Sequence, residues 1–317
     1  MFLYHISNLL FSQIEPHSAF DQYKKNGNIY AVYAANNIKY CLPFGLLKDS
    51  FYGDYCWENK DGNDAIIYYG NFILNEVAYI YGMNDDGFKQ ISKNQYVSES
   101  STQYIYYVKI NPSKYISNIS FKHDIVKIKL DYKKFENEYG VLIERFNTLF
   151  NFFIETEVDN KIIKLFNKYL NEALETFETY CLESYKHDIM HSVNTMFNSI
   201  FLINELNIKK NIEELLFVAC YHDVGRSLNF NSIKHGELSW ILVKRFLSGK
   251  KLSEDLIKYL IINHNNKYLA QANINLSIIY DADVFDLTRF KNKIICKSNF
   301  ININSIKKLE ELLNAKQ

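Results

Sequence analysis

The chain has 317 residues, enough for two domains of about 150 residues each. Hydrophobic residues make up 48% and charged residues 23%, as in soluble globular proteins, which excludes a disordered, collagen-like or coiled-coil chain. The 36 basic and 36 acidic residues give a formal net charge of zero. The total charge therefore provides no overall attraction to nucleic acid or to an anionic membrane, although it is compatible with a local charged patch.

The N-terminal segment lacks the basic start and the uninterrupted apolar core of a signal peptide. Apolar runs stay short of the roughly twenty residues that a membrane helix requires. We therefore expect a cytoplasmic protein without a membrane partner. The five cysteines are scattered and form no CxxC pair, so neither a disulfide framework nor a thiolate zinc site is predicted. Cys220, in the apolar run LLFVAC, is expected to be a core residue rather than a nucleophile.

The N-terminal part is rich in short β-branched and aromatic runs, separated by clusters of Asn, Asp and Gly. Strands are predicted at Ile29–Ala35, Ala65–Tyr69, Val77–Tyr81, Gln103–Lys109 and Ile125–Leu130. All three prolines and seven of the eleven glycines lie in the first 112 residues, which indicates a change of domain further along. The fold class predicted for residues 1–125 is a strand-rich α+β domain.

Beyond the last of these strands, apolar residues recur at helical spacing, and no proline interrupts them. One helix is expected to begin near His187. A second can be capped by Asn211 and ended by Gly225, and a third is opened by Ser253. An all-helical domain is predicted for residues 126–317.

Six imidazole and carboxylate side chains fall on inward-facing positions of these helices. They are His191, His222, Asp223, His235, His264 and Asp283. A single histidine of this kind is more often a hydrogen-bonded core residue, whereas four of them with two carboxylates favour a metal site. Imidazole and carboxylate without thiolate suit first-row divalent metals, and six ligands suffice for two ions that share a carboxylate. Such a pair of ions is suited to phosphate ester hydrolysis.

Five motifs carry a family resemblance. They are HDIMHSVNTM (187–196), FVACYHDVGR (217–226), KHGELS (234–239), LIINH (260–264) and IYDADVFDLTRF (279–290). In these motifs the chain resembles the HD superfamily of metal-dependent phosphohydrolases, over about residues 177–290. The resemblance implies that His191, His222, Asp223 and Asp283 are the core metal ligands. It also implies that His235 and His264 hold a second metal, with Asp223 as the bridge.

The resemblance also distinguishes two neighbouring aspartates. Asp283 is preferred to Asp281 as the last ligand, because the family places this ligand directly after an alanine. His187, which shares a helix face with His191, is expected to support the ligands or the substrate, with an exposed surface histidine as the alternative. Catalytic roles are therefore expected for Asp223 and His187.

Two arginines are candidates for binding a substrate phosphate. Arg226 stands where many family members have lysine, and its guanidinium could hold a phosphate in a forked arrangement and take part in catalysis. A salt bridge that closes the loop is an equal alternative. Arg289, six residues after Asp283, could reach the same pocket, or it could lie on a solvated helix face.

The N-terminal part contains three further motifs in a familiar order. They are LYHIS (3–7), NIYAVYAANNIKYC (28–41) and TQYIYYVKI (102–110). Together they resemble the strand-borne motifs of ADP-ribosyltransferases, which implies a site for NAD or another nucleotide at His5, Tyr33 and Gln103. Many transferases have glutamate at the third position, so Gln103 puts transfer activity in doubt. The alternative is a strand-rich recognition domain in which these residues only pack.

The function expected from the whole sequence is that of a metal-dependent phosphohydrolase. It would cleave a phosphomonoester or phosphodiester with two divalent ions among Mn, Fe, Co, Ni, Zn and Mg. The family resemblance implies a nucleotide-like substrate, because family members commonly act on nucleotides. One alternative is an NAD-using N-terminal domain that modifies protein or nucleic acid, with the helical domain processing the product. A second alternative is a non-catalytic binding protein that metal stabilises.

Overall fold

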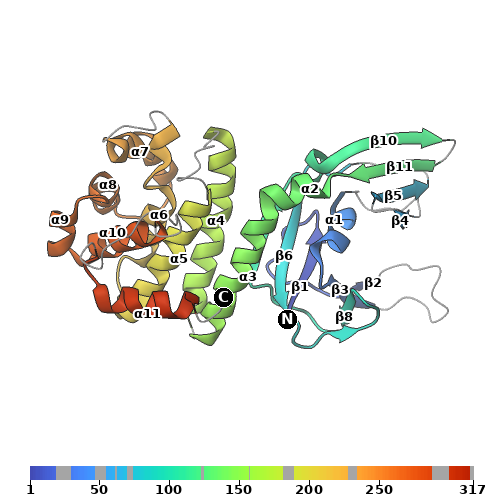
Figure 1. Ribbon diagram of the computed structural model, residues 1–317, viewed down its shortest axis with the longest axis horizontal. Coiled ribbons are helices and arrows are strands. Elements are labelled where there is room, and N and C mark those ends of the chain that lie inside the picture. The colour runs from blue at the N-terminus through green and yellow to red at the C-terminus, as the bar shows by residue number, and fades with distance from the viewer. Residues whose placement is uncertain are drawn as a thin grey trace. The chain divides into compact units, whose positions relative to one another are not determined.

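The computed structural model of the chain describes residues 1–18, 30–46, 55–60, 63–69, 74–122, 125–156, 158–180, 189–227, 234–287 and 300–314. The chain divides into two compact units, Met1–Phe152 (the first unit) and Phe153–Gln317 (the second unit). The first is rich in strands and the second is helical (Figure 1). This confirms the predicted fold class.

The main sheet of the first unit is built from antiparallel pairs. Its described strands are β1 (Phe2–Ser7), β2 (His17–Ser18), β3 (Tyr30–Ala35), β6 (Ala78–Asn84), β7 (Lys89–Gln90), β8 (Gln95–Ser98) and β9 (Tyr106–Ile110). They follow the order β7-β8-β3-β1-β6-β9, and β2 pairs with β3. Helix α1 (Ile38–Leu46) packs against β1 and β3. Because β1 lies between two strands and under this helix, four consecutive residues of it are buried, His5 among them.

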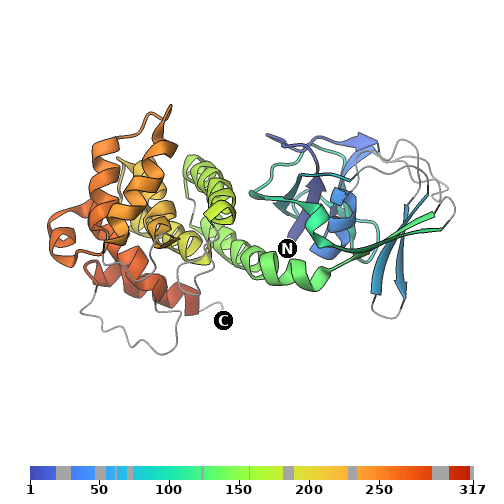
Figure 2. The same ribbon diagram turned by 90° about the horizontal axis from the view of Figure 1, so that it is seen from above.

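A smaller sheet, in blue and green in Figure 2, belongs to the same unit. Its strands are β4 (Tyr55–Lys60), β5 (Asn63–Tyr69), β10 (Ile116–Lys122) and β11 (Ile125–Leu130), in the order β10-β11-β5-β4. The predicted boundary after residue 125 falls inside β11, which pairs with β10 on one side and with β5 on the other. The first unit therefore extends past that boundary to Phe152.

Short helical segments complete the first unit. They are η1 (Pro112–Tyr115), α2 (Tyr132–Phe135), the π-helical η2 (Glu136–Gly140) and α3 (Val141–Glu155), which runs across the division at Phe152.

The second unit is built around one buried helix, α5 (Ile189–Glu205). The other described helices are α4 (Asn160–Tyr180), α6 (Ile212–Tyr221), η3 (Val224–Ser227), α7 (His235–Val243), η4 (Lys244–Leu247), α8 (Glu254–Asn263), α9 (Lys267–Ala272), α10 (Ile274–Asp286) and α11 (Ile303–Asn314). Helices α4, α6, α10 and α11 pack on α5, so residues 191–203 are buried on every side (Figure 1). Among the described helices, none combines the length and the apolar character needed to cross a membrane.

The helix ends show where local sequence patterns were sufficient. Ser253 caps α8 as predicted, because its hydroxyl accepts a hydrogen bond from the Leu256 N–H at 3.4 Å. Asn211 is the N-cap residue of α6, but its backbone is left-handed (φ 60°) and its side chain makes no capping hydrogen bond, so that part of the prediction is wrong. Cys220 is fully buried and its thiol donates to the Tyr169 carbonyl at 3.5 Å, which confirms its place in the core.

Gly225 does not end α6, contrary to prediction, since α6 ends at Tyr221 and Gly225 lies inside η3. The physical reason for a glycine here is the close approach of α7. A Cβ at this position would overlap the backbone of His235 and Ser239.

Candidate metal centre

The ends and inner faces of the second unit's helices bring six predicted ligands to one buried region. His191 comes from α5, His222 and Asp223 directly follow α6, His235 begins α7, His264 caps the end of α8, and Asp283 lies on α10. Each of them is at most 9% exposed. Titratable side chains at this depth are usually paired with other polar groups or coordinate a metal.

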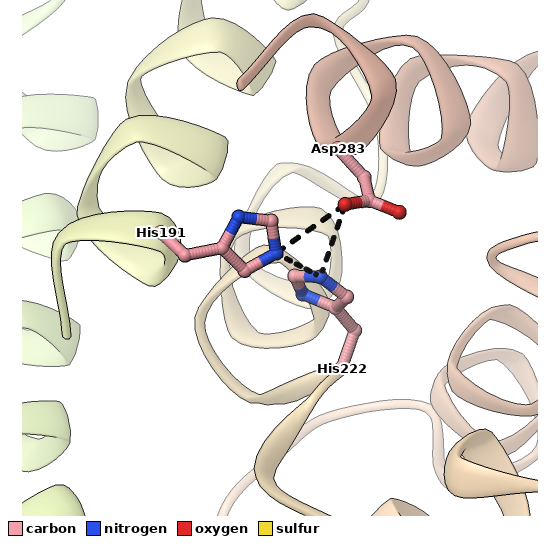
Figure 3. Close-up of side chains that lie close together, drawn as sticks. All are labelled: His191, His222 and Asp283. Carbon is pink, nitrogen blue, oxygen red and sulfur yellow. Dashed lines mark hydrogen bonds and ion pairs between the residues drawn. The ribbon is translucent and has the colours of Figure 1, made fainter. Parts of the chain in front are cut away.

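The first cluster consists of His191, His222 and Asp283, whose side chains point toward one another in Figure 3. The two Nε2 atoms of His191 and His222 are 3.0 Å apart. The Asp283 Oδ1 atom lies 3.3 Å from the His191 Nε2 atom and 3.7 Å from the His222 Nε2 atom. Three ligand atoms from three helices therefore face one point.

The second cluster consists of Asp223, His235 and His264. The Nε2 atoms of His235 and His264 are 2.9 Å apart. The Asp223 Oδ1 atom lies 3.2 Å from the first of these nitrogens and 3.5 Å from the second. Its other oxygen, Oδ2, lies 3.4 Å from the His191 Nε2 atom. The two oxygens of Asp223 thus face different clusters, which is the arrangement of a bridging carboxylate.

Hydrogen bonds on the far side of the rings fix their tautomers. The Nδ1 atom of His222 lies 3.0 Å from the Ala219 carbonyl, and the Nδ1 atom of His264 lies 2.7 Å from the Ile261 carbonyl. Because a carbonyl only accepts, both Nδ1 atoms carry the proton. In the neutral rings the Nε2 atoms are then bare lone pairs directed into the clusters, as metal binding requires.

The same argument applies to His191, whose Nδ1–H donates to the Asp286 carboxylate at 2.7 Å. In the neutral form of His191, its Nε2 lone pair meets the Nε2 lone pair of His222 at 3.0 Å. Two such lone pairs repel each other unless a cation or a proton lies between them. A divalent cation at the usual distance of about 2.1 Å from each nitrogen would satisfy both lone pairs.

Burial and mutual charge shift the pKa values of all three residues in the first cluster. Burial favours the neutral form of Asp283, but hydrogen bonds and charge from His191 and His222 outweigh this and hold its pKa well below the ordinary value. Burial likewise favours neutral His191, yet the neighbouring carboxylates raise its pKa well above the ordinary value. Burial is the main cause that lowers the pKa of His222. The cluster therefore combines an ionised Asp283 carboxylate with two unlike imidazoles. The charged form is favoured for His191 and the neutral form for His222.

Asp286 lies at the site but was not among the residues predicted from the sequence. It is 4% exposed, and while one carboxylate oxygen accepts from His191, the other accepts from the Asn194 amide at 2.7 Å. A carboxylate behind a metal-binding histidine orients the ring and raises its basicity. The spacing is the sequence signal that could have identified it. Asp286 follows Asp283 by three residues and Asn194 follows His191 by three, so each pair lies on one face of its helix.

Asp281 has a different environment from Asp283. It is fully buried and accepts hydrogen bonds from the backbone N–H groups of Ile301 and Asn302, at 2.9 and 2.7 Å, and from the Asn302 side chain. Its carboxylate therefore anchors the start of α11 to α10, whereas the carboxylate of Asp283 faces the histidines.

Arg226 lies at the second cluster. Its Nε atom is 3.1 Å from the Asp223 Oδ1 atom, and its Nη2 atom is 3.2 Å from the His235 Nε2 atom. Of the two roles considered for this residue, the structure shows the salt bridge. The other two candidate side chains, His187 and Arg289, lie outside the described residues.

Close backbone contacts hold the second cluster together. Next to His235, Gly236 lets α7 approach α8 so closely that a Cβ at Gly236 would come within 2.6 Å of the Ile261 carbonyl oxygen. That same carbonyl accepts the Nδ1–H of His264. The spacing between His235 and His264 is thus determined by the main chain as well as by the rotamers.

In the first unit, the structure brings two of the three predicted nucleotide-site residues together. The Nδ1–H of His5 donates to the Tyr33 carbonyl at 2.8 Å, and burial lowers the pKa of His5 to about 4. The rings of both residues lie near that of His17, with centroids 6.3 and 6.0 Å away. Gln103 donates to the Gln13 side chain at 2.6 Å.

The chain was compared with protein families, curated proteins and solved structures. Residues 188–288 match the family model of the HD domain, and this segment contains all six predicted ligands. Among curated proteins and among solved structures, no match was found. The resemblance of the first unit to ADP-ribosyltransferases stays a prediction. The second unit, with its buried cluster of histidines and aspartates, contains an HD domain, a domain of metal-dependent phosphohydrolases.

Proposed function

We propose that the second unit hydrolyses a phosphomonoester or phosphodiester at a centre of two divalent cations. The observation that carries the proposal is the 3.0 Å separation of the His191 and His222 Nε2 atoms, which converge on Asp283 while their Nδ1 atoms donate to other acceptors. Ligand atoms converge in this way at a metal site, where the outer ring nitrogens are held by hydrogen bonds.

The donor set fits two cations. His191, His222, Asp283 and one oxygen of Asp223 would hold the first cation, and His235, His264 and the other oxygen of Asp223 would hold the second. When bound, the cations supply Lewis acidity toward a phosphoryl group and lower the pKa of water at the site. The absence of thiolate ligands favours Mn, Fe, Co, Ni, Zn or Mg over softer ions.

The chain's own residues contribute orientation and electrostatics. Carbonyl and carboxylate acceptors hold the imidazole rings in one tautomer, so the ligand atoms need little rearrangement. Asp283 stays ionised at neutral pH because its pKa is low. Arg226 is 18% exposed and supplies a guanidinium for the substrate phosphate. His187, four residues before His191, and Arg289, six residues after Asp283, are proposed from these positions to act on the same substrate.

The substrate proposed is a small phosphate ester, nucleotide-like, because HD domains commonly act on nucleotides and cyclic nucleotides. The test uses the purified full-length chain, loaded in turn with each candidate metal. Simple esters such as p-nitrophenyl phosphate and bis-p-nitrophenyl phosphate are assayed first, followed by nucleoside monophosphates and cyclic nucleotides.

Asp223→Ala removes the bridge and should reduce hydrolysis by several orders of magnitude. Asp255→Asn is the matched control, because Asp255 is an exposed carboxylate in the first turn of α8, and it should retain full activity. Full activity of Asp223→Ala would refute the proposal. Metal that raises the melting temperature without any ester cleavage would favour the non-catalytic alternative instead.

A second candidate function concerns the first unit, and the contact between His5 and Tyr33 favours it. We propose that this unit recognises NAD, ADP-ribose or a related nucleotide, with Tyr33 stacking on a planar ring. Gln103 offers a neutral amide where a transferase would use a carboxylate to stabilise developing positive charge, so binding should exceed turnover. The product of any slow transfer could then be a substrate for the second unit.

Calorimetry on the full-length chain with NAD and ADP-ribose tests this second function. Tyr33→Ala should abolish the heat of binding, while Tyr30→Ala should not, because Tyr30 lies on the same strand but is 63% exposed. Equal effects of the two variants, or no heat with either nucleotide in the wild type, would refute nucleotide recognition by the first unit.

A further inference from the structure

The guanidinium of Arg226 contacts the same two ligand atoms that a second cation would need. Its Nε atom lies 3.1 Å from the Asp223 Oδ1 atom, and its Nη2 atom lies 3.2 Å from the His235 Nε2 atom. A guanidinium only donates hydrogen bonds, so His235 accepts through its Nε2 lone pair. The His235 Nε2 atom and the Asp223 Oδ1 atom are 3.2 Å apart.

From this shared contact we infer that Arg226 competes with the second divalent cation, and that a phosphate-bearing ligand relieves the competition by drawing the guanidinium away. The inference rests on the proposed function and deepens it. A positive group held against Asp223 and His235 repels a cation and occupies its ligands. The second cation therefore binds more weakly than the first until Arg226 moves.

The surroundings of the two clusters predict the order in which the two cations bind. In the first cluster, His191 is supported from behind by the Asp286 carboxylate, which increases its affinity for a cation. In the second, the Nδ1 atom of His264 donates to the Ile261 carbonyl, a neutral acceptor, and Arg226 adds a positive charge. The first cation should therefore bind tightly at the first cluster, and the second should follow.

The position of Arg226 makes it responsive to an anion. Its side chain is 18% exposed, against 3% for Asp223, so it lies at the edge of the buried site. It belongs to the short helical turn η3, not to one of the long helices. Guanidinium binds phosphate oxygens in a forked arrangement, which offers Arg226 an alternative to Asp223 and His235. Because linkage is reciprocal, phosphate should strengthen binding of the second cation, and the second cation should strengthen binding of phosphate.

Manganese titration of the metal-stripped full-length protein tests the inference without using catalysis. Calorimetry measures the two dissociation constants, and electron paramagnetic resonance detects spin coupling once both ions are bound. In the wild type, the second Mn²⁺ should bind at least about tenfold more weakly than the first, and inorganic phosphate should reduce this difference.

Arg226→Gln removes the positive charge and keeps a polar side chain. It should strengthen the second Mn²⁺ site by at least about tenfold without phosphate, and the phosphate effect should shrink. Arg245→Gln is the matched control, because this guanidinium lies over the Phe246 ring on η4, and it should titrate as the wild type does. Arg226→Lys keeps the charge but loses the fork, so the second site should stay weak while its response to phosphate falls.

A second site that is unchanged or weaker in Arg226→Gln, with the circular dichroism spectrum of the wild type, would overturn the inference. If that variant fails to fold, Arg226→Lys decides, because a wild-type phosphate response in it would overturn the inference as well. These failures leave the two-cation centre intact. Wild-type protein that binds less than one Mn²⁺ would instead refute the proposed function itself.

Discussion

His191 and Asp286 are joined by a 2.7 Å contact between Nδ1 and Oδ2, although they lie 95 residues apart in the sequence. The contact leaves the opposite nitrogen of His191 directed at His222. It depends on the packing of α5 against α10, which the Asn194 amide reinforces by donating to the same carboxylate. The packing of α5 against α10 thus determines the direction in which the His191 Nε2 atom points.

Asp286→Ala should weaken binding of the first metal ion by about 10- to 100-fold, because His191 loses the acceptor that orients it. Asp286→Asn keeps an acceptor without the charge, so its effect should be smaller. Titration with Co²⁺, followed by its visible absorption, measures the affinity. Wild-type affinity in both variants would contradict a supporting role for this carboxylate.

Asp281 and Asp283 should separate stability from metal binding. Asp281→Ala removes the acceptor of three hydrogen bonds at the start of α11 and should lower the free energy of unfolding by about 2–3 kcal/mol. Asp283→Ala should instead reduce metal affinity, because its carboxylate faces the histidines. Urea unfolding and metal titration of both variants test this. A larger loss of metal affinity in Asp281→Ala than in Asp283→Ala would reverse the assignment.

The pH dependence of stability should show the burial of His5. The folded pKa of about 4 lies below the ordinary value of 6.5, so between these values the unfolded chain takes up a proton that the folded chain does not. Stability contributed by this group is full above pH 6.5 and is lost as the pH falls toward 4. The expected loss between pH 7 and pH 5 is about 2 kcal/mol.

His5→Gln can still donate to the Tyr33 carbonyl but does not titrate. Urea unfolding of the wild type and of this variant at both pH values isolates the contribution of His5, since all other groups are common to the two proteins. Identical pH dependence in both would show that His5 does not stay neutral in the folded protein.

Gly225→Ala should destabilise the second unit by about 1–3 kcal/mol, because the added Cβ overlaps the backbone of His235 and Ser239. It should also weaken the second metal site, since His235 has to move. Gly140→Ala is the matched control, because its Cβ would meet Glu136 only at 3.5 Å, an ordinary contact. Thermal unfolding and metal titration measure both effects, and equal stability of the two variants would contradict the packing argument.

Sequence patterns predicted the elements that depend on local alternation or helical spacing. The prediction of Ile125–Leu130 coincides with β11, and Ser253 caps α8 as expected. The HD motifs predicted the family of the second unit, which the family model confirms. The structure brings the six predicted ligands into two adjoining clusters, while their role as ligands stays a prediction.

Features that depend on distant partners were not predictable in the same way. Strand β10 (Ile116–Lys122) mixes Ser and Asn with apolar residues, so its sequence alone does not predict a strand. Its pairing with β11 makes it one. The extent of the first unit follows from that pairing and not from composition. Asp286 was missed because its partner, His191, becomes a neighbour only when α5 packs on α10.

Two glycines in the second unit, Gly225 and Gly236, allow α7 to lie directly against its neighbours. Neither has a side chain that could bind a cation, yet each determines how far His235 stands from its partners. Inherited variation at these two positions would therefore shift His235 while every candidate ligand stays the same. A comparison of ligand residues alone would not detect such a difference between two related proteins.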